Sequence, residues 1–260
     1  MSARNLIIKA IALIVMSQVS ACRNIFFTAD SNNSDGYLTP TAEIAENIDR
    51  FLGRSVVVRN DAIEQIGESG FLLDLDGLTN NEPILAINIS SMPFITSDDG
   101  TPEIVVTGVV ETLNLKKLQQ EYNLNLDRRL YEQYEGKPVI IANSIILSPD
   151  PENVSDRPEL YYNLPLAVQG EVDDVEDEYG LFELDEEKAF GGEDLLILTI
   201  EPVELAEEQM VIVFGVLRSF VAAELKRDYQ LDWSSSTQTQ LEAEYSKKPV
   251  FIADKIEILN

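Results

Sequence analysis

The sequence predicts a mainly β protein with some α-helix, built as two tandem small five-stranded barrels, each with a helical insert between strands four and five. The first observation behind this prediction is a repeat: residues Val105 to Leu126 recur about 107 residues later as Ile212 to Trp233. Both copies then end on similar segments, Lys137 to Leu147 and Lys248 to Ile258. The second is a series of short apolar runs separated by turn residues, which is typical of strands. A repeat of this length is too long for a solenoid unit and fits a small duplicated domain.

Four strands are predicted in each copy before the helical insert. They cover residues 56–66, 71–75, 84–87 and 104–113 in the first copy, and 166–175, 181–184, 195–200 and 211–220 in the second. A fifth strand starts at each Lys-Pro pair, where proline is tolerated because the first residue of a strand need not donate a hydrogen bond. Gly108 and Gly215 lie at the same place in both fourth strands and indicate a bend or bulge. A sheet that curls there favours a small barrel.

Helices are predicted before the first strand and within each insert. The first runs from near Glu43 to Gly53. The insert helices have apolar residues at spacings i, i+3 and i+7, which place them on one face; these residues are Leu115, Leu118 and Tyr122 in the first copy and Ala222, Leu225 and Tyr229 in the second. A second short helix is expected over Leu130–Tyr134 and over Leu241–Tyr245.

The N-terminus has the features of a targeting segment. Arg4 and Lys9 precede an apolar run, and the segment ends on Val19-Ser20-Ala21-Cys22. This ending resembles the lipobox of bacterial lipoproteins, and the resemblance implies cleavage before Cys22 and acylation of that cysteine, with palmitate among the lipids. The alternative is an ordinary signal peptide followed by a chance cysteine. The sequence disfavours a transmembrane anchor because the apolar run is shorter than the roughly 20 residues that cross a bilayer.

Four segments follow from these features. Residues 1–21 are a lipoprotein signal peptide, 22–42 a lipid-anchored flexible spacer, 43–150 the first repeat and 151–260 the second. The mature chain is then anchored to a membrane of the bacterial cell envelope, with soluble domains on the extracytoplasmic, periplasmic side. Cys22 is the only cysteine, so no internal disulfide can form.

The charge excludes nucleic acid as a partner. The formal net charge is −27, from 46 acidic and 19 basic residues, and such a surface repels phosphate backbones. Residues 41–150 hold 18 acidic and 8 basic side chains, whereas residues 151–260 hold 26 and 8, giving nets of −10 and −18. The second copy therefore attracts cations more strongly, although high negative charge also serves solubility.

The densest acidic run is a candidate Ca²⁺ site. It consists of Asp173, Asp174, Glu176, Asp177 and Glu178, placed where the first strand of the second copy turns into the next. Ca²⁺ takes six to eight oxygen ligands, often from flexible loops. The competing interpretation is a solvated hairpin turn on an acidic protein.

Three aromatic residues are candidate ligand contacts. Tyr122 and Tyr229 occupy matching positions, and Trp233 is the only tryptophan. Together they suit the floor of a site for a sugar or a peptide. Packing of the insert onto the barrel would retain the same residues, and the sequence favours this interpretation.

The amino-acid composition does not favour an enzyme. The chain has no histidine and, with Cys22 acylated, no free thiol, so the commonest general base and the commonest strong nucleophile are missing. No spacing selects a carboxylate pair from the 46 acids. We expect no enzyme activity and no cofactor.

The predicted barrel resembles the oligonucleotide/oligosaccharide-binding (OB) fold, with the helix moved from its usual place between strands three and four. The chain is also similar to uncharacterised bacterial envelope lipoproteins with tandem repeats that contain GEV, FGGEDLL and PVxIA segments. Gly170-Glu171-Val172 and Phe190 to Leu196 match in the second copy, whereas the first has Asn60-Asp61-Ala62 and Thr79 to Leu85. The resemblance implies no activity. The expectation is a non-catalytic binding or assembly module for an envelope protein or glycan, and the alternative is a Ca²⁺-responsive protein.

Overall fold

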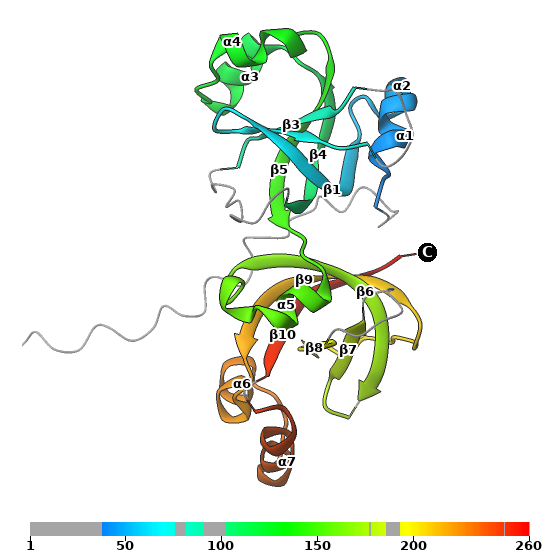
Figure 1. The fold of residues 1–260 in the computed structure, drawn as a ribbon, viewed down its shortest axis with the longest axis vertical. Helices are drawn as coiled ribbons and strands as arrows, with labels where there is room; N and C mark the ends of the chain where they lie inside the picture. Colours follow the sequence, from blue (N-terminus) through cyan, green and yellow to red (C-terminus); the bar gives the residue numbers. More distant parts are fainter. Residues whose placement is uncertain are drawn as a thin grey trace, which may run out of the picture. The chain divides into compact units, whose positions relative to one another are not determined.

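The computed structural model of the protein describes residues 38–75, 82–90, 102–176, 178–185, 193–246 and 248–259. Long strands dominate these residues, and short helices lie between them (Figure 1). The predicted class, mainly β with α, is therefore confirmed.

Ten strands and nine short helical segments span the described residues. The strands are β1 (Ser55–Ile66), β2 (Gly70–Leu73), β3 (Ile84–Asn88), β4 (Glu103–Thr112), β5 (Pro138–Leu147), β6 (Pro165–Glu176), β7 (Leu181–Asp185), β8 (Leu195–Thr199), β9 (Met210–Ser219) and β10 (Pro249–Ile258). The helices are α1 (Thr41–Glu46), α2 (Ile48–Phe51), α3 (Leu115–Tyr122), α4 (Arg128–Tyr131), α5 (Pro151–Asp156), α6 (Ala222–Tyr229) and α7 (Ser235–Tyr245), with 3₁₀ turns η1 (Glu132–Tyr134) and η2 (Pro158–Leu160).

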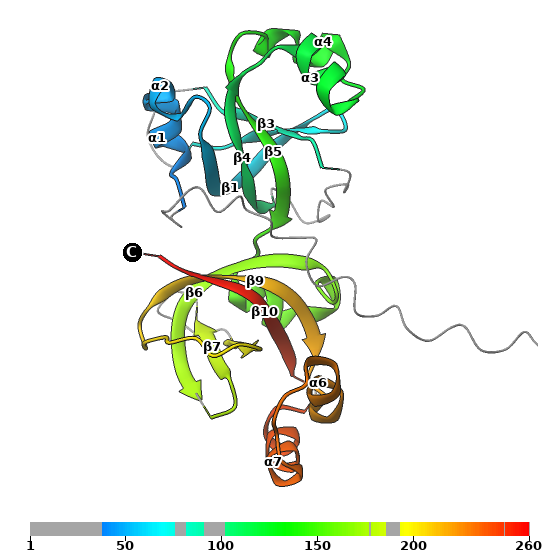
Figure 2. The ribbon, with the colours of Figure 1, turned by 180° about the vertical axis from the view of Figure 1, so that it is seen from behind.

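The first five strands close a barrel. β1 pairs antiparallel with β2 and β4, β2 pairs with β3, β4 pairs with β5, and β3 runs parallel to β5 (Figures 1 and 2). These pairings form a ring, so the predicted closed five-stranded barrel is confirmed. β6 to β10 add further strands, and they pair in the same cyclic order. One residue pair, Leu147 with Leu166, connects β5 to β6.

The predicted bend lies at the two glycines of β4 and β9. The register between β4 and β5 shifts beside Gly108, and the register between β9 and β10 shifts beside Gly215. A Cβ atom would lie 2.4 Å from the Ile141 carbonyl oxygen at Gly108 and 2.0 Å from that of Ile252 at Gly215. Only glycine allows so close an approach of two backbones. The extra residue of each bulge is on the strand that faces the glycine.

Two apolar clusters hold the first barrel together. All five strands contribute to one of them, through side chains such as Val58, Leu73 and Val106, so the ring encloses it. α1 and α2 add Ile44 and Phe51 to this cluster. The opposite faces of β2, β3 and β5 carry a second cluster, which packs against α3 and α4. Each fully buried Leu, Ile or Val contributes about 1.5–3 kcal/mol, so strands covered on both sides are the main source of stability.

The strands β6 to β10 carry the same two kinds of cluster. One includes Val168, Leu184, Ile197, Val213 and Phe251, one from each strand, and Val154 of α5 joins it. The other lies between the opposite strand faces and the helices α6 and α7.

The helices differ from prediction mainly in extent. The helix expected from Glu43 begins at Thr41 and is interrupted at Asn47. The helix expected over Leu241–Tyr245 begins six residues earlier, because the Ser234 hydroxyl accepts a hydrogen bond from the Thr237 amide and caps the first turn. α5 and η2 were not predicted.

Arg59 of β1 ties the end of β5 to the segment before α5. Its guanidinium donates to the Ser148 hydroxyl at 2.8 Å and lies 2.7 Å from Glu103 and 3.5 Å from Asp150. The Arg59 side chain is 15% exposed and Ser148 is fully buried. A charge so far from water requires partners of this kind.

Candidate functional site

The helical segment after β4 has an ordered start. The Asn114 side chain accepts a hydrogen bond from the Lys117 amide, and Glu135 accepts one from the Leu115 amide at 3.1 Å. Both bonds satisfy amides that a helix start leaves without a partner. α3 is thereby fixed against the end of β4.

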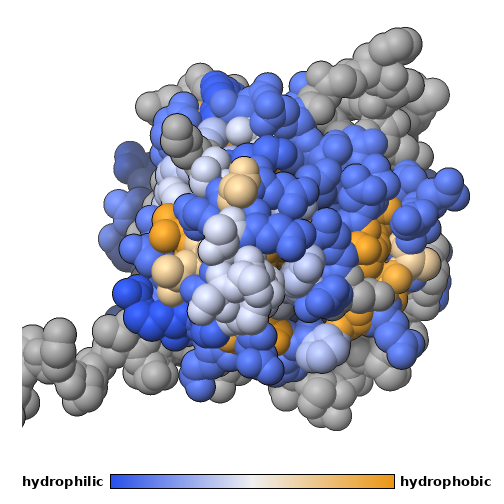
Figure 3. All heavy atoms as spheres, turned by 90° about the horizontal axis from the view of Figure 1, so that it is seen from below, coloured by the Kyte–Doolittle hydropathy of each residue, from blue (hydrophilic) through white to orange (hydrophobic). Residues whose placement is uncertain are grey.

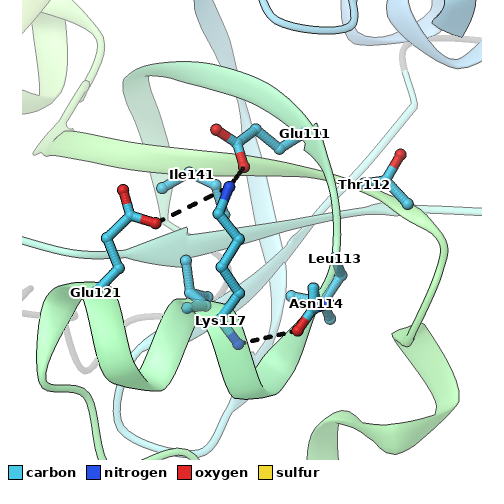
Figure 4. A pocket seen from close by; sticks show the side chains of 8 residues that line it. Glu111, Thr112, Leu113, Asn114, Lys117, Glu121 and Ile141 are labelled. Atoms are coloured by element: carbon cyan, nitrogen blue, oxygen red, sulfur yellow. Dashed lines mark hydrogen bonds and ion pairs between the residues drawn. The ribbon is translucent and has the colours of Figure 1, made fainter.

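A small hollow lies at this start of α3 (Figure 4). It is lined by Glu111, Thr112, Leu113, Asn114, Lys117, Leu118, Glu121 and Ile141. The Lys117 ammonium lies between two carboxylates, 3.7 Å from Glu111 and 3.9 Å from Glu121. The hollow has a volume of about 10 Å³, close to the smallest space that accepts one water molecule. A hollow of this size does not enclose a small ligand. It suits contact with the surface of a partner molecule.

The charges at the matching positions of the second copy are rearranged. Arg218 stands in the position of Glu111, and Asp228 in the position of Glu121. These two side chains form an ion pair at 3.5 Å. α3 and α6 are therefore each joined to the preceding strand by a charge pair, but with different residues.

The candidate aromatic residues differ in exposure. Tyr122 is 36% exposed beside the hollow, and Tyr229 is half-buried against the cluster under α6. Burial raises the pKa of Tyr122, and the carboxylates of Glu121 and Glu111 add to this shift. Burial also raises the pKa of Tyr229, whereas Arg218 opposes it. Of the two matched tyrosines, Tyr122 offers the more accessible ring.

Trp233 is packed in the interior. It is 5% exposed, and its ring centroid lies 6.4 Å from that of Phe220. Its indole N–H donates to the Tyr179 carbonyl at 3.4 Å. The matching residue of the first copy is Leu126, which is also 5% exposed. A buried leucine at the same place indicates a packing position, so the three aromatic residues do not share one accessible surface.

The acidic run lies at the end of β6 and the turn that follows. Asp173, Asp174 and Glu178 are exposed, and Glu176 is half-buried, while Asp177 lies outside the described residues. Asp174 has a φ of 41°, and its amide donates to the Asp173 carboxylate at 2.9 Å. One oxygen of Glu176, Oε2, is buried and has no hydrogen-bond partner among the described residues. Burial raises the pKa of Glu176, with Glu244 and Asp174 as smaller causes.

Neighbouring strands add more carboxylates to this region. Burial raises the pKa of Glu183 on β7, and it is also the main cause that raises the pKa of Asp194 just before β8. Even so, no group of three or more acidic side chains within the described ranges is arranged to hold a metal ion. The Ca²⁺ site stays a prediction.

Cys22 and the signal peptide lie outside the described residues, as does the spacer up to residue 37. Across the ranges that the structure covers, no helix has the length and apolar character needed to pass through a bilayer. Lipid attachment at Cys22 therefore stays a prediction from sequence.

Apolar side chains are scattered over the surface. Within the described ranges six large ones are exposed, namely Leu52, Ile63, Tyr122, Leu130, Leu160 and Ile258. They lie on different elements, and the face drawn in Figure 3 is mostly hydrophilic with separate small apolar areas. Single exposed apolar residues are normal in soluble proteins.

Sequence reasoning missed a carboxylate that caps each insert helix. Glu135 does so for α3, and the Glu242 carboxylate accepts from the Ala222 amide of α6 at 2.7 Å. With the offset of 107 residues that relates α3 to α6, Glu135 falls on Glu242, and each lies 20 residues after the amide that it caps. This common spacing is the signal that could have found them.

The comparisons with known proteins add no assignment. No family model matches the chain, and no curated protein matches it in sequence. The resemblance to tandem-repeat envelope lipoproteins accordingly stays a prediction.

Proposed function

We propose that the protein is a membrane-anchored lipoprotein that acts as a non-catalytic binding or assembly module of the bacterial cell envelope. Its two repeats, residues 43–150 and 151–260, are OB-like barrels in tandem, each with a helical insert between its fourth and fifth strands. The same cyclic strand pairing and the same two packed clusters in each set of five strands support this division.

The partner is an envelope protein or a glycan that contacts the α3 side of the first repeat. The observation that carries this proposal is Tyr122, an exposed aromatic ring beside the charged group of Glu111, Lys117 and Glu121. An aromatic ring with charged neighbours is typical of recognition surfaces, because the ring offers contact area and the charges give orientation.

Anchoring is tested with the full chain in its own host. We expect the wild-type protein in the membrane fraction with an acylated residue 22, because several acyl chains hold a protein far more tightly than one. The Cys22→Ser variant should move to the soluble fraction. A Cys22→Ser variant that stays with the membrane, or an unmodified Cys22 by mass spectrometry, contradicts the anchor.

Binding is tested by recovery of partners with the tagged full-length protein. We expect Tyr122→Ala to reduce recovery of an envelope component about tenfold, since a central aromatic contact contributes 1–2 kcal/mol or more. Leu130→Ala removes an exposed apolar residue of α4 and is the matched control. Sensitivity of the recovered partner to protease or to glycosidase separates protein from glycan. Equal recovery with all three proteins contradicts the α3 surface.

A further inference from the structure

In the hollow at the start of α3, the Lys117 ammonium lies between the carboxylates of Glu111 and Glu121 (Figure 4). The two N–O distances, 3.7 and 3.9 Å, are longer than a hydrogen bond. The three side chains are 40–62% exposed, and ion pairs so exposed contribute little to stability. Lys117 is therefore a loosely held cation, and a cation from another molecule can replace it.

The ring of Tyr122 adds an aromatic face to this charged group. Tyr122 ends α3, directly after Glu121, and is 36% exposed. Burial raises the pKa of its phenol, and the carboxylates of Glu121 and Glu111 raise it further. Their effect on Tyr122 indicates that the ring and the two carboxylates are close enough to contact one bound group together.

A cationic side chain is the group that fits this arrangement. A guanidinium donates hydrogen bonds to carboxylates, and a tyrosine ring attracts a cation that lies within about 6 Å of its centre. The hollow is too small to enclose a separate ligand, so we expect the cation to belong to the surface of a larger molecule. A neutral sugar has no charge for the carboxylates to attract, and an acidic sugar is repelled by them.

The second copy does not have the same charges around its matching tyrosine. Arg218 stands in the position of Glu111 and lies 3.5 Å from Asp228. Burial raises the pKa of Tyr229, and Arg218 opposes this shift. A cation of the chain itself thus compensates the negative charge beside Tyr229, and that ring is also less accessible.

We propose that the partner of the α3 surface is a protein that places an arginine or lysine side chain on the Tyr122 ring, between the carboxylates of Glu111 and Glu121. The incoming cation replaces Lys117, which turns toward solvent. This identity of the partner rests on the binding function proposed above, since it concerns the same surface.

The first test compares variants of opposite charge change in recovery of the envelope component by the tagged full-length protein. We expect Lys117→Gln to increase recovery and Glu121→Gln to decrease it, each by about threefold, which corresponds to an exposed cation–π contact. Lys117→Gln acts in this direction because it removes the cation that competes for the site. Lys116→Gln makes the same change of charge at the neighbouring exposed residue of α3 and should recover as much as wild type.

The second test uses a defined probe on the full chain with ¹³C-labelled tyrosine rings. The probe is Nα-acetyl-arginine amide, and Nα-acetyl-citrulline amide is the neutral control of nearly the same shape. We expect the arginine probe to shift the ring signals of Tyr122 in a saturable way and to leave those of Tyr229 unchanged. The citrulline probe should shift neither ring. Tyr→Phe variants at the two positions assign the signals.

The outcomes separate this proposal from the binding function on which it rests. Equal recovery by Tyr122→Ala and wild type contradicts the binding function itself. If Tyr122→Ala lowers recovery while Lys117→Gln and Glu121→Gln change it in the same direction or leave it unchanged, the surface binds but the cationic partner is overturned. Reversed signs identify an anionic partner, such as an acidic glycan, and also overturn it. So does an arginine probe that shifts Tyr229 as much as Tyr122, or that acts no differently from citrulline.

Discussion

At Gly108 and Gly215, a carbonyl oxygen of the facing strand occupies the space that a side chain needs. The distances of 2.4 and 2.0 Å from an added Cβ mean that the backbones must separate before alanine fits. We expect Gly215→Ala to lower the free energy of unfolding by about 3 kcal/mol, with Gly108→Ala somewhat milder. Chemical denaturation measures both effects.

Gly136 provides the matched control for these two glycines. It has a φ of 77°, but no atom lies within 4 Å of an added Cβ. Alanine there meets only backbone strain, which costs about 1 kcal/mol. If Gly215→Ala is no more costly than Gly136→Ala, the close approach of β9 and β10 is not what requires glycine.

Arg59 of β1 contacts Ser148, Glu103 and Asp150 near the end of β5. Its bonds to Glu103 and Ser148 and its low exposure predict a loss of about 2–3 kcal/mol for Arg59→Ala, because Ser148 and a partly buried carboxylate lose their partner. Arg50→Ala is the comparison: Arg50 lies 2.8 Å from Glu43, but its side chain is 64% exposed. Its removal should cost under about 0.5 kcal/mol. Equal losses in thermal melts contradict the account of Arg59.

At the scale of elements, α3 and α6 each depend on a carboxylate from outside their own first turn. Glu242→Ala should destabilise the protein by about 1 kcal/mol, because the Ala222 amide at the start of α6 loses its acceptor. Glu244→Ala, two residues later on α7, should be neutral or slightly stabilising, because it removes a negative neighbour of Glu176. Denaturant unfolding distinguishes the two, and a larger loss for Glu244→Ala contradicts the capping role.

The strands were predictable because their apolar residues alternate. β1 shows this alternation in its burial, with Val56, Val58 and Ala62 inside and Ser55, Asp61 and Ile63 outside. The start of α7 was not predictable from apolar spacing, since residues 235–240 are polar and only the Ser234 cap marks the helix start. The two glycines predicted that a bulge would occur. They did not predict that its extra residue lies on the facing strand, because this depends on how the two strands pair.

The candidate site was less predictable than the fold. The repeat itself aligns Trp233 with Leu126, a comparison that favours packing, and both residues are buried. The exposure of Tyr122 and the half-buried state of Glu176 depend on how the insert and the β6–β7 turn pack. The spacing of apolar residues within one segment does not predict how segments far apart in the sequence pack together.

At the scale of the whole molecule, the net charge of −27 should make stability depend on salt. We expect the melting temperature to rise between about 0.01 and 0.2 M NaCl, because salt screens the repulsion among carboxylates. CaCl₂ at matched ionic strength should raise it no further if the acidic run is only a solvated turn. An additional rise at millimolar Ca²⁺ that Asp173→Asn and Asp174→Asn remove favours the calcium alternative instead.

We propose that a tethered barrel protein binds an envelope partner through the α3 side of its first repeat. The most direct measurement is site-specific photocrosslinking in intact cells, with the reactive residue at position 122 and, as control, at the exposed position 116 of the same helix. We predict a discrete crosslinked product from position 122 that is weak or missing from position 116 and is lost in the Cys22→Ser background. No product from position 122, or equal products from both positions, contradicts the claim.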